Sequence, residues 1–87
     1  STSSHDKSAP EALVVSVDRS NIIWFDGRQV GKEEVTGLVR GAAAGRPVSV
    51  VVNADRLGPS GLLIEVIDQI RLGGVANVAV ATNAGHS

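Results

Sequence analysis

The chain is poor in reactive and aromatic side chains. It contains no cysteine, and its aromatic residues are one tryptophan and one phenylalanine, with no tyrosine. The lack of cysteine excludes a disulfide framework, a thiolate zinc site and a cysteine nucleophile. The shortage of aromatic rings leaves almost no surface on which nucleic-acid bases could stack.

Neither sign of charge dominates the sequence. Eight Lys and Arg stand against nine Asp and Glu, scattered along the chain. A protein that follows a nucleic-acid backbone needs a basic stripe, so we expect no nucleic-acid partner. No stretch approaches the roughly 20 apolar residues that a membrane-spanning helix requires.

Composition divides the chain into three parts. Residues 1–12 are rich in serine and charge and lack apolar periodicity, which predicts a flexible leader or linker. Residues 13–82 are predicted to form one domain, and residues 83–87 a polar tail. A domain of about 70 residues hides only roughly 60–65% of its unfolded surface, so association with a second copy would stabilise it.

The first part of the domain has the patterns of short strands. Residues 13–17 alternate with a period of two, and residues 22–25 follow after a turn, which predicts a hairpin. Asp26-Gly27 is a two-residue turn signal because both positions tolerate positive φ. Val30 is therefore predicted to close a short third strand.

Two amphipathic helices alternate with strands in the rest of the domain. The first helix is predicted to end at Gly45 and the second at Gly73 or Gly74, with Ser60 as the N-cap of the second. Residues 48–53 form a nearly continuous β-branched strand, which is typical of a central position, and residues 75–82 form the last strand. The predicted buried stripes of the helices are Val35, Leu38, Val39 and Ala42 in the first, and Leu63, Val66, Ile67 and Ile70 in the second.

The resulting order is β-β-(β)-α-β-α-β. This order predicts an α/β (α+β) fold, a small two-layer sandwich in which two helices cover one face of a four- to five-stranded mixed sheet.

A series of short motifs follows one another between residues 51 and 82: Ala54-Asp55-Arg56, Pro59, Gly61, Val66-Ile67-Asp68, Gly74 and Ala81-Thr82. This series, together with the upstream hairpin, resembles the periplasmic domain of the ExbD/TolR family of biopolymer transport proteins, and the likeness covers nearly all of residues 13–82. At the turn before the second helix the family commonly has an aromatic residue, where this chain has Ser60.

The resemblance implies a role in energy transduction. Members of the family accompany an ExbB/TolQ-type channel in the inner membrane, draw on the proton gradient, and pass energy to a spanning protein of the TonB or TolA type. The proton-carrying acid lies in a membrane helix that precedes the periplasmic domain. The domain itself forms homodimers, engages the spanning partner and, in some members, grips peptidoglycan. These relationships imply a periplasmic, non-enzymatic domain with no catalytic residue, no metal and no cofactor.

Asp55 and Arg56 lie at the mouth of the second predicted helix and have two interpretations. They form either an exposed ion pair in the connection between the strand and the helix, or part of a recognition surface at the positive end of the helix. His5 and His86 lie near the chain ends, where we expect them to be solvated. The candidate partner-binding residues are Asp55, Arg56, Ser60, Asp68, Val78, Val80 and Thr82.

The last strand is expected to be an assembly surface. Residues 76–82 are uncharged and free of proline, and an uncovered edge there would offer backbone groups to a second copy or to a partner's strand. Ile64 and Leu72 fall off the buried stripe of the second helix. These features predict a homodimer whose pairing involves this strand.

Two alternatives from other classes stay open. Residues 58–61 form a G-x-x-G loop before a helix, as in KH domains that clamp RNA, although the loop lacks the basic middle residues of such domains. The other alternative is a small ligand-binding or regulatory α/β module.

Overall fold

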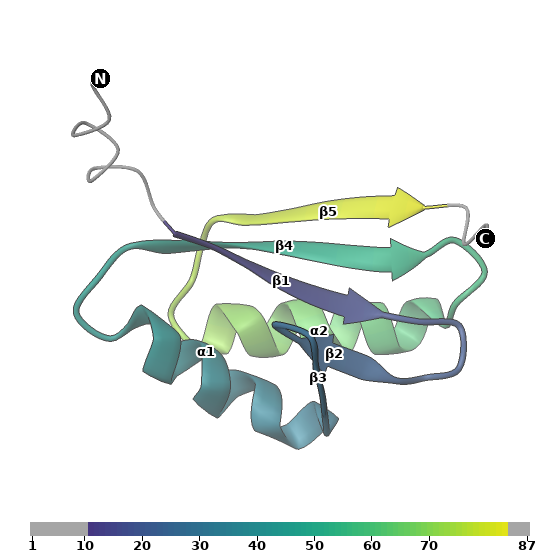
Figure 1. Ribbon diagram of the computed structural model, residues 1–87, viewed down its shortest axis with the longest axis horizontal. Helices are drawn as coiled ribbons and strands as arrows, with labels where there is room; N and C mark the ends of the chain where they lie inside the picture. The colour runs from purple at the N-terminus through teal and green to yellow at the C-terminus, as the bar shows by residue number, and fades with distance from the viewer. Residues whose placement is uncertain (1–10, 84–87) are drawn as a thin grey trace.

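The computed structural model describes residues 11–83, which fold into a sheet of five strands with two α-helices along one side (Figure 1). A short 3₁₀ turn, η2, leads into the first helix. The elements are β1 (Glu11–Val17), β2 (Ile23–Phe25), β3 (Arg28–Val30), η2 (Lys32–Glu34), α1 (Val35–Ala43), β4 (Val48–Asp55), α2 (Ser60–Leu72) and β5 (Val78–Asn83).

The strand order across the sheet is β3-β2-β1-β4-β5. The β1–β4 and β4–β5 pairs are parallel, while β1–β2 and β2–β3 are antiparallel. The three parallel strands therefore end at the same side of the molecule (Figure 1). The predicted fold class, a two-layer α+β sandwich with a five-stranded mixed sheet, is confirmed.

The hairpin between β2 and β3 turns where the sequence predicts. Asp26 has φ 52° and Gly27 has φ 86°, and Phe25 pairs with Arg28 on either side of them. Two consecutive positive φ values match the twist of the flanking strands, which is why Asp-Gly is favoured there.

One layer of aliphatic side chains between the sheet and the helices forms the core. Alternate residues of β1 and β4 point into it because side chains alternate across a strand. Both helices complete the layer with the valines and isoleucine of their predicted stripes. The fully buried members are Val15, Val35, Val39, Val50, Val52, Val66 and Ile70.

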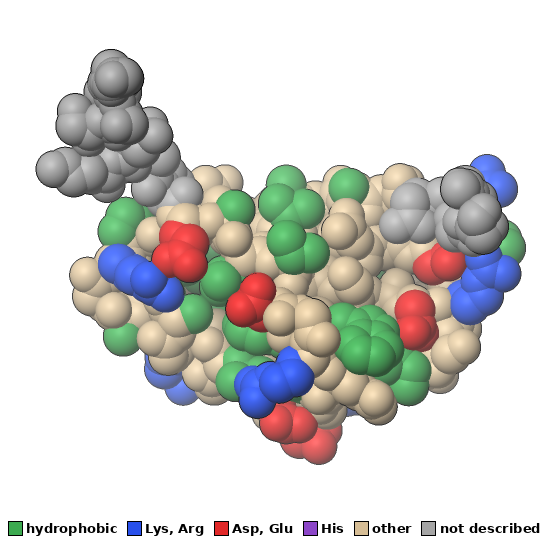
Figure 2. Space-filling model, in the orientation of Figure 1, with side chains coloured by type: hydrophobic (Ala, Val, Ile, Leu, Met, Phe, Trp, Pro, Cys, Tyr) green, Lys and Arg blue, Asp and Glu red, His purple; other side chains and the backbone are tan. Residues whose placement is uncertain are grey.

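The opposite face of the sheet is uncovered. Val14 is 42% exposed and Trp24 37% exposed, while Val51 in β4 is only half-buried. β4 is an interior strand, as its β-branched run predicts, but only one of its faces lies in the core. On the face seen in Figure 2, charged side chains lie at the two ends and over the hairpin and helices, and one acidic side chain lies near the middle of the view.

Two strand boundaries differ from those expected. β1 begins at Glu11, within the stretch assigned to the leader, because Glu11 pairs with Val48 and its carboxylate contacts Arg46 at 2.7 Å. β5 begins at Val78 instead of residue 75, because β4 first pairs with β5 at Val50. Val75 still contributes to the core, where it is 3% exposed.

The two helices cross closely at Gly73. A methyl group at this position would lie 2.9 Å from Val39 Cγ1 and 3.0 Å from the carbonyl oxygen of Thr36. Thr36 Oγ1 donates to the Gln69 backbone carbonyl at 3.0 Å, which fixes the crossing. The absence of a side chain at Gly73 therefore allows α1 and α2 to share one core.

We predict that Gly73→Ala destabilises the domain by about 1–3 kcal/mol, because overpacking forces α1 away from α2. Gly37→Ala is the matched control, since nothing lies within 4 Å of a methyl group there. The control should be neutral or stabilising by up to about 1 kcal/mol, as expected for glycine replaced within a helix. Urea unfolding measures both, and equal effects of the two substitutions would contradict the close crossing.

Candidate functional site

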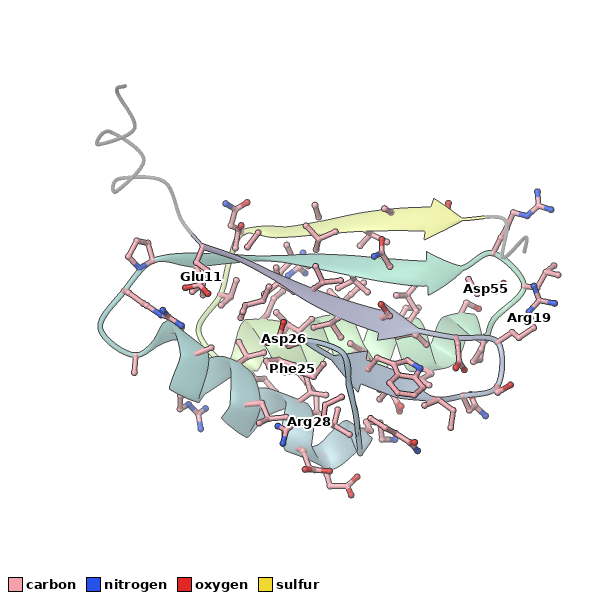
Figure 3. The ribbon with its side chains drawn as sticks, viewed as in Figure 1. Glu11, Arg19, Phe25, Asp26, Arg28 and Asp55 are labelled. Carbon is pink, nitrogen blue, oxygen red and sulfur yellow. The ribbon has the colours of Figure 1, made fainter. Side chains whose placement is uncertain are left out.

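The ends of β1, β4 and β5 and the start of α2 meet at one end of the molecule, and the candidate site lies there. Ligands of α/β proteins commonly bind beyond the carboxyl ends of parallel strands. Figure 3 shows Arg19 and Asp55 at this end, while Glu11 lies towards the other. The site combines the turn after β1, the loop from β4 to α2, and the edge of β5.

Asp18 organises the turn after β1. One carboxylate oxygen accepts the backbone N–H groups of Ser20 at 2.8 Å and Ile22 at 3.0 Å, and the other accepts Trp24 Nε1 at 3.2 Å. These bonds, the one from Trp24 above all, hold the pKa of Asp18 below its ordinary value. Sequence reasoning identified the turn and missed this role, although an aspartate that begins a turn is a signal for it.

Asp55 pairs with Arg19 and not with Arg56. Its carboxylate lies 3.3 Å from Arg19 Nε and accepts the backbone N–H of Leu57 at 2.8 Å. Only 14% of the Asp55 side chain is exposed. The expected exposed pair between Asp55 and Arg56 is therefore wrong, because Asp55 turns back to stabilise its own loop and to hold the turn after β1.

Four of the predicted site residues line one cavity of about 210 Å³: Asp55, Arg56, Ser60 and Thr82. Val17, Ala54 and Leu63 supply apolar walls to the same cavity. The structure thus brings together residues from β4, the following loop, α2 and β5. Arg56 is exposed, so its guanidinium is the accessible charge of this set.

Ser60 does not cap α2 as the sequence predicts. The N-cap position is Pro59, with an extended backbone at φ −73° and ψ 120°, and no side chain caps it. Ser60 is consequently the first helical residue, and it lines the cavity. The N-cap therefore lies one residue earlier than the sequence predicts. Proline fixes φ near −65°, which is compatible with the extended backbone at this position.

Asp68 does not join this group. It is exposed two turns further along α2, beside a separate hollow that Arg71 and Leu72 also line. Eight residues of helix separate it from Ser60 by about 12 Å.

Val78, Val80 and Thr82 lie along the outer strand of the sheet. They share the side of the sheet on which Val50, Val52 and Ala54 of β4 enter the core, but Val80 is 47% exposed. Val50 N–H donates to the Asn77 carbonyl at 3.0 Å. In a parallel ladder alternate residues bond to the same neighbour, so the backbone groups of Val78, Val80 and Thr82 point away from β4.

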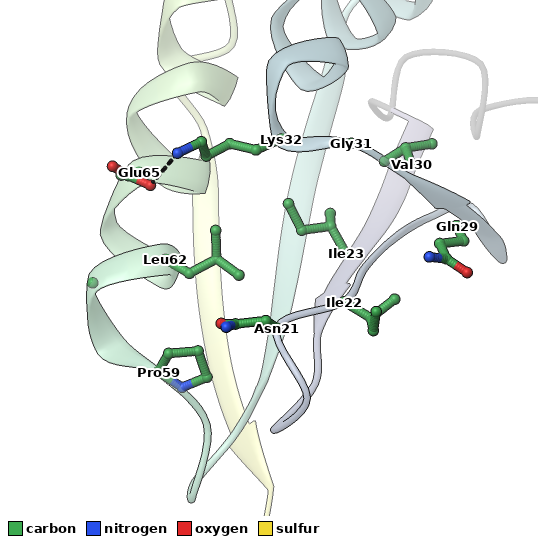
Figure 4. A pocket seen from close by; sticks show the side chains of 11 residues that line it. Asn21, Ile22, Ile23, Gln29, Val30, Gly31, Lys32, Pro59, Leu62 and Glu65 are labelled. Carbon is green, nitrogen blue, oxygen red and sulfur yellow. Dashed lines mark hydrogen bonds and ion pairs between the residues drawn. The ribbon is translucent and has the colours of Figure 1, made fainter.

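A second hollow, of about 380 Å³, lies between the β2–β3 hairpin and the start of α2 (Figure 4). Ile22, Ile23 and Leu62 line it with apolar surface. Lys32 Nζ contacts Glu65 Oε1 at 2.9 Å on its rim, which ties η2 to α2 and holds the pKa of Lys32 above its ordinary value. The exposure of both side chains makes this a surface ion pair that is worth little to stability.

A metal-ligand cluster and a membrane-spanning helix are both absent from the part of the chain that the structure describes. Between residues 11 and 83 no three His, Cys, Asp or Glu side chains cluster to hold a metal ion. His5 and His86 lie outside the described residues. No helix in the described part of the chain is long and apolar enough to cross a membrane.

Comparison with models of protein families gives a match over nearly the whole chain. The family model described as biopolymer transport protein ExbD/TolR matches residues 1–85. No curated protein matched the chain.

We predict that Asp55→Ala costs about 1–3 kcal/mol of folding stability, since it removes two hydrogen bonds to a largely buried carboxylate. Arg56→Ala, a substitution of the adjacent exposed residue, should stay within about 0.5 kcal/mol. Urea unfolding of both variants measures the contrast. A larger loss of folding stability in Arg56→Ala than in Asp55→Ala would contradict the hydrogen bonds assigned to the Asp55 carboxylate.

We predict that Asp18 no longer contributes to folding stability in acid. Because its pKa is lowered in the folded state, ionised Asp18 stabilises the fold at neutral pH, and this contribution is lost as the pH falls through the folded-state pKa. Asp18→Asn should therefore be clearly less stable than wild type at pH 7 and close to it in acid. Fluorescence of Trp24, the single tryptophan, reports unfolding, and Asp68→Asn is the control. A difference in stability between wild type and Asp18→Asn that stays the same at every pH would contradict the stabilising role of ionised Asp18.

Proposed function

The chain belongs to the ExbD/TolR family of biopolymer transport proteins, and from that premise we propose that residues 11–83 are the periplasmic part of an inner-membrane, energy-transducing subunit. The family couples energy to transport and its members are not enzymes. The specific role proposed for this domain is to engage a spanning partner of the TonB or TolA type. Its link to an ExbB/TolQ-type channel would run through a membrane helix.

The observation that carries the proposal is the unpaired edge of β5. Val78, Val80 and Thr82 direct their N–H and C=O groups away from β4, and no described element pairs with that side. An extended peptide can add to such an edge as a further strand, with backbone bonds giving affinity and side chains giving specificity. The other edge, β3, has only three residues, which protects it from pairing.

The cavity beside Thr82 supplies a place for specificity. A strand added along β5 passes the cavity lined by Arg56, Ser60 and Thr82. Arg56 can pair with an acidic side chain of the partner, and the apolar walls of Val17 and Leu63 can hold an aliphatic one.

We propose no catalytic activity for this domain. Asp55 is engaged by Arg19 and by the Leu57 N–H, and no other side chain that lines the cavity could act as a base towards Ser60. A catalytic role would need such a pair within hydrogen-bonding distance. Binding and release of the partner are therefore the proposed work of the domain.

We predict that a periplasmic peptide from a TonB- or TolA-type protein shifts the amide resonances of residues 78–83 in NMR titrations. Val80→Pro removes an outward N–H and should weaken binding at least tenfold while the domain stays folded. Gln29→Pro is the control, because it alters β3 at the opposite edge. Shifts confined to other surfaces, or equal losses in both variants, would refute binding at β5.

A further inference from the structure

We propose that the turn after β1 couples the partner cavity to the open face of the sheet, so that a carboxylate in the cavity weakens the hydrogen bond between Trp24 and Asp18. The partner cavity is the one of about 210 Å³ that Arg56, Ser60 and Thr82 line, and the open face is the side of the sheet opposite the helices. This inference rests on the proposed function, in which the cavity receives an acidic side chain, and adds a response at a second surface of the domain.

A chain of contacts leads from the partner cavity to Trp24. Asp55 lines the cavity, and its carboxylate lies 3.3 Å from Arg19 Nε (Figure 3). Arg19 directly follows Asp18, whose carboxylate accepts Trp24 Nε1 at 3.2 Å. Trp24 lies on the open face, because its two neighbours in β2 point into the core. Asp55, Arg19 and Asp18 therefore join two surfaces of the domain.

The loop from β4 to α2 and the turn after β1 also touch through their backbones at Gly58. A methyl group on Gly58 would lie 3.3 Å from the Asp18 carbonyl oxygen and 3.4 Å from Arg19 Cα. The N–H of Gly58 donates to the Asp55 carbonyl at 2.8 Å, which holds Gly58 within its own loop. Because the two backbones pack this closely, the loop cannot move towards the turn without displacing it.

Asp18 holds the turn after β1 together as one unit. Its carboxylate accepts the N–H groups of Ser20 and Ile22, and its own N–H donates to the Ile22 carbonyl at 3.0 Å. Asn21, at φ 68°, donates to the Asp18 carbonyl at 3.2 Å. Arg19 thus lies within a ring of groups that all bond to Asp18. A displacement of Arg19 therefore reaches the Asp18 carboxylate and is not absorbed within the turn.

A second carboxylate in the partner cavity would act first on Asp55. The two negative charges would repel each other at close range, and both would attract the Arg19 guanidinium. The Arg19 side chain is 48% exposed and has room to shift, whereas the Asp55 side chain is 14% exposed. We expect Arg19 to move towards the cavity and to draw Asp18 away from Trp24.

The bond between Trp24 and Asp18 is the contact in this chain that is lost most easily. It is exposed, so water can replace either partner, whereas the bond from Ile22 to the same carboxylate is partly buried. Trp24 therefore has two states, bonded to Asp18 or open to solvent, and a charge in the cavity shifts the balance between them. By linkage, a contact that fixes Trp24 would change the affinity of the cavity for an acid.

An introduced carboxylate tests the coupling without any partner. Ser60→Asp places a negative charge in the cavity, and Ser60→Asn is the matched uncharged control. An acidic residue is favourable at the start of a helix, so the domain is expected to stay folded. Solvent exchange of the Trp24 indole N–H, measured by NMR, should be at least threefold faster in Ser60→Asp than in Ser60→Asn. Thr82→Asp against Thr82→Asn repeats the comparison from β5, and equal rates within both pairs would overturn the inference.

A double-mutant cycle tests the route through Arg19. In an Arg19→Gln background the difference in Trp24 exchange between Ser60→Asp and Ser60→Asn should disappear, because the link from Asp55 to the turn is removed. Arg28→Gln, a change of the same kind in β3, is the control and should leave the difference intact. A difference that persists in full without Arg19 would contradict the route.

The outcomes separate this inference from the proposed function. If a TonB- or TolA-type peptide shifts β5 resonances while Trp24 exchanges equally in Ser60→Asp and Ser60→Asn, the inference fails and the proposed function stands. If Trp24 exchange responds to Ser60→Asp through Arg19 and no such peptide binds, the coupling stands and the proposed function fails.

Discussion

The structure depends on the parallel pairing of β1, β4 and β5. This ladder brings the ends of three strands to one side of the molecule, where the Asp55 loop and the start of α2 meet them. The same ladder uses only alternate backbone groups of β5 and leaves the others pointing outward. One constraint thus creates both the cavity with Arg56 and the open edge with Val80, and it makes them neighbours.

The outer edge of β5 can pair with only one further strand at a time. A second copy and a strand of a spanning partner would compete for the outward groups of Val78, Val80 and Thr82. Binding of either occupant at this edge would therefore exclude the other. The small, uncharged side chains of β5 suit this exchange, since neither occupant must break an ion pair within the strand.

The local patterns of the sequence predicted most of the fold. The two-residue period of β1, the stripe of Val66 and Ile70, and the Asp26-Gly27 turn each depend on neighbours within a few residues, and the structure confirms them. The contacts of the site were harder to predict. Asp55 is held by Arg19, 36 residues earlier, and no local pattern distinguishes that partner from the adjacent Arg56. The start of β5 was also misplaced, because it depends on where β4 begins to pair with it.

Amide hydrogen exchange along β5 tests the central claim, that this strand presents an alternating open edge for assembly. In dilute solution the amides of Val78, Val80 and Thr82 should exchange rapidly, while those of Ala79 and Ala81, which face β4, are protected. At high protein concentration, or with partner peptide present, the three outward amides should become protected and the inward ones should change little. Uniform protection along β5 in dilute solution, or outward amides that stay unprotected under every condition, would contradict the account.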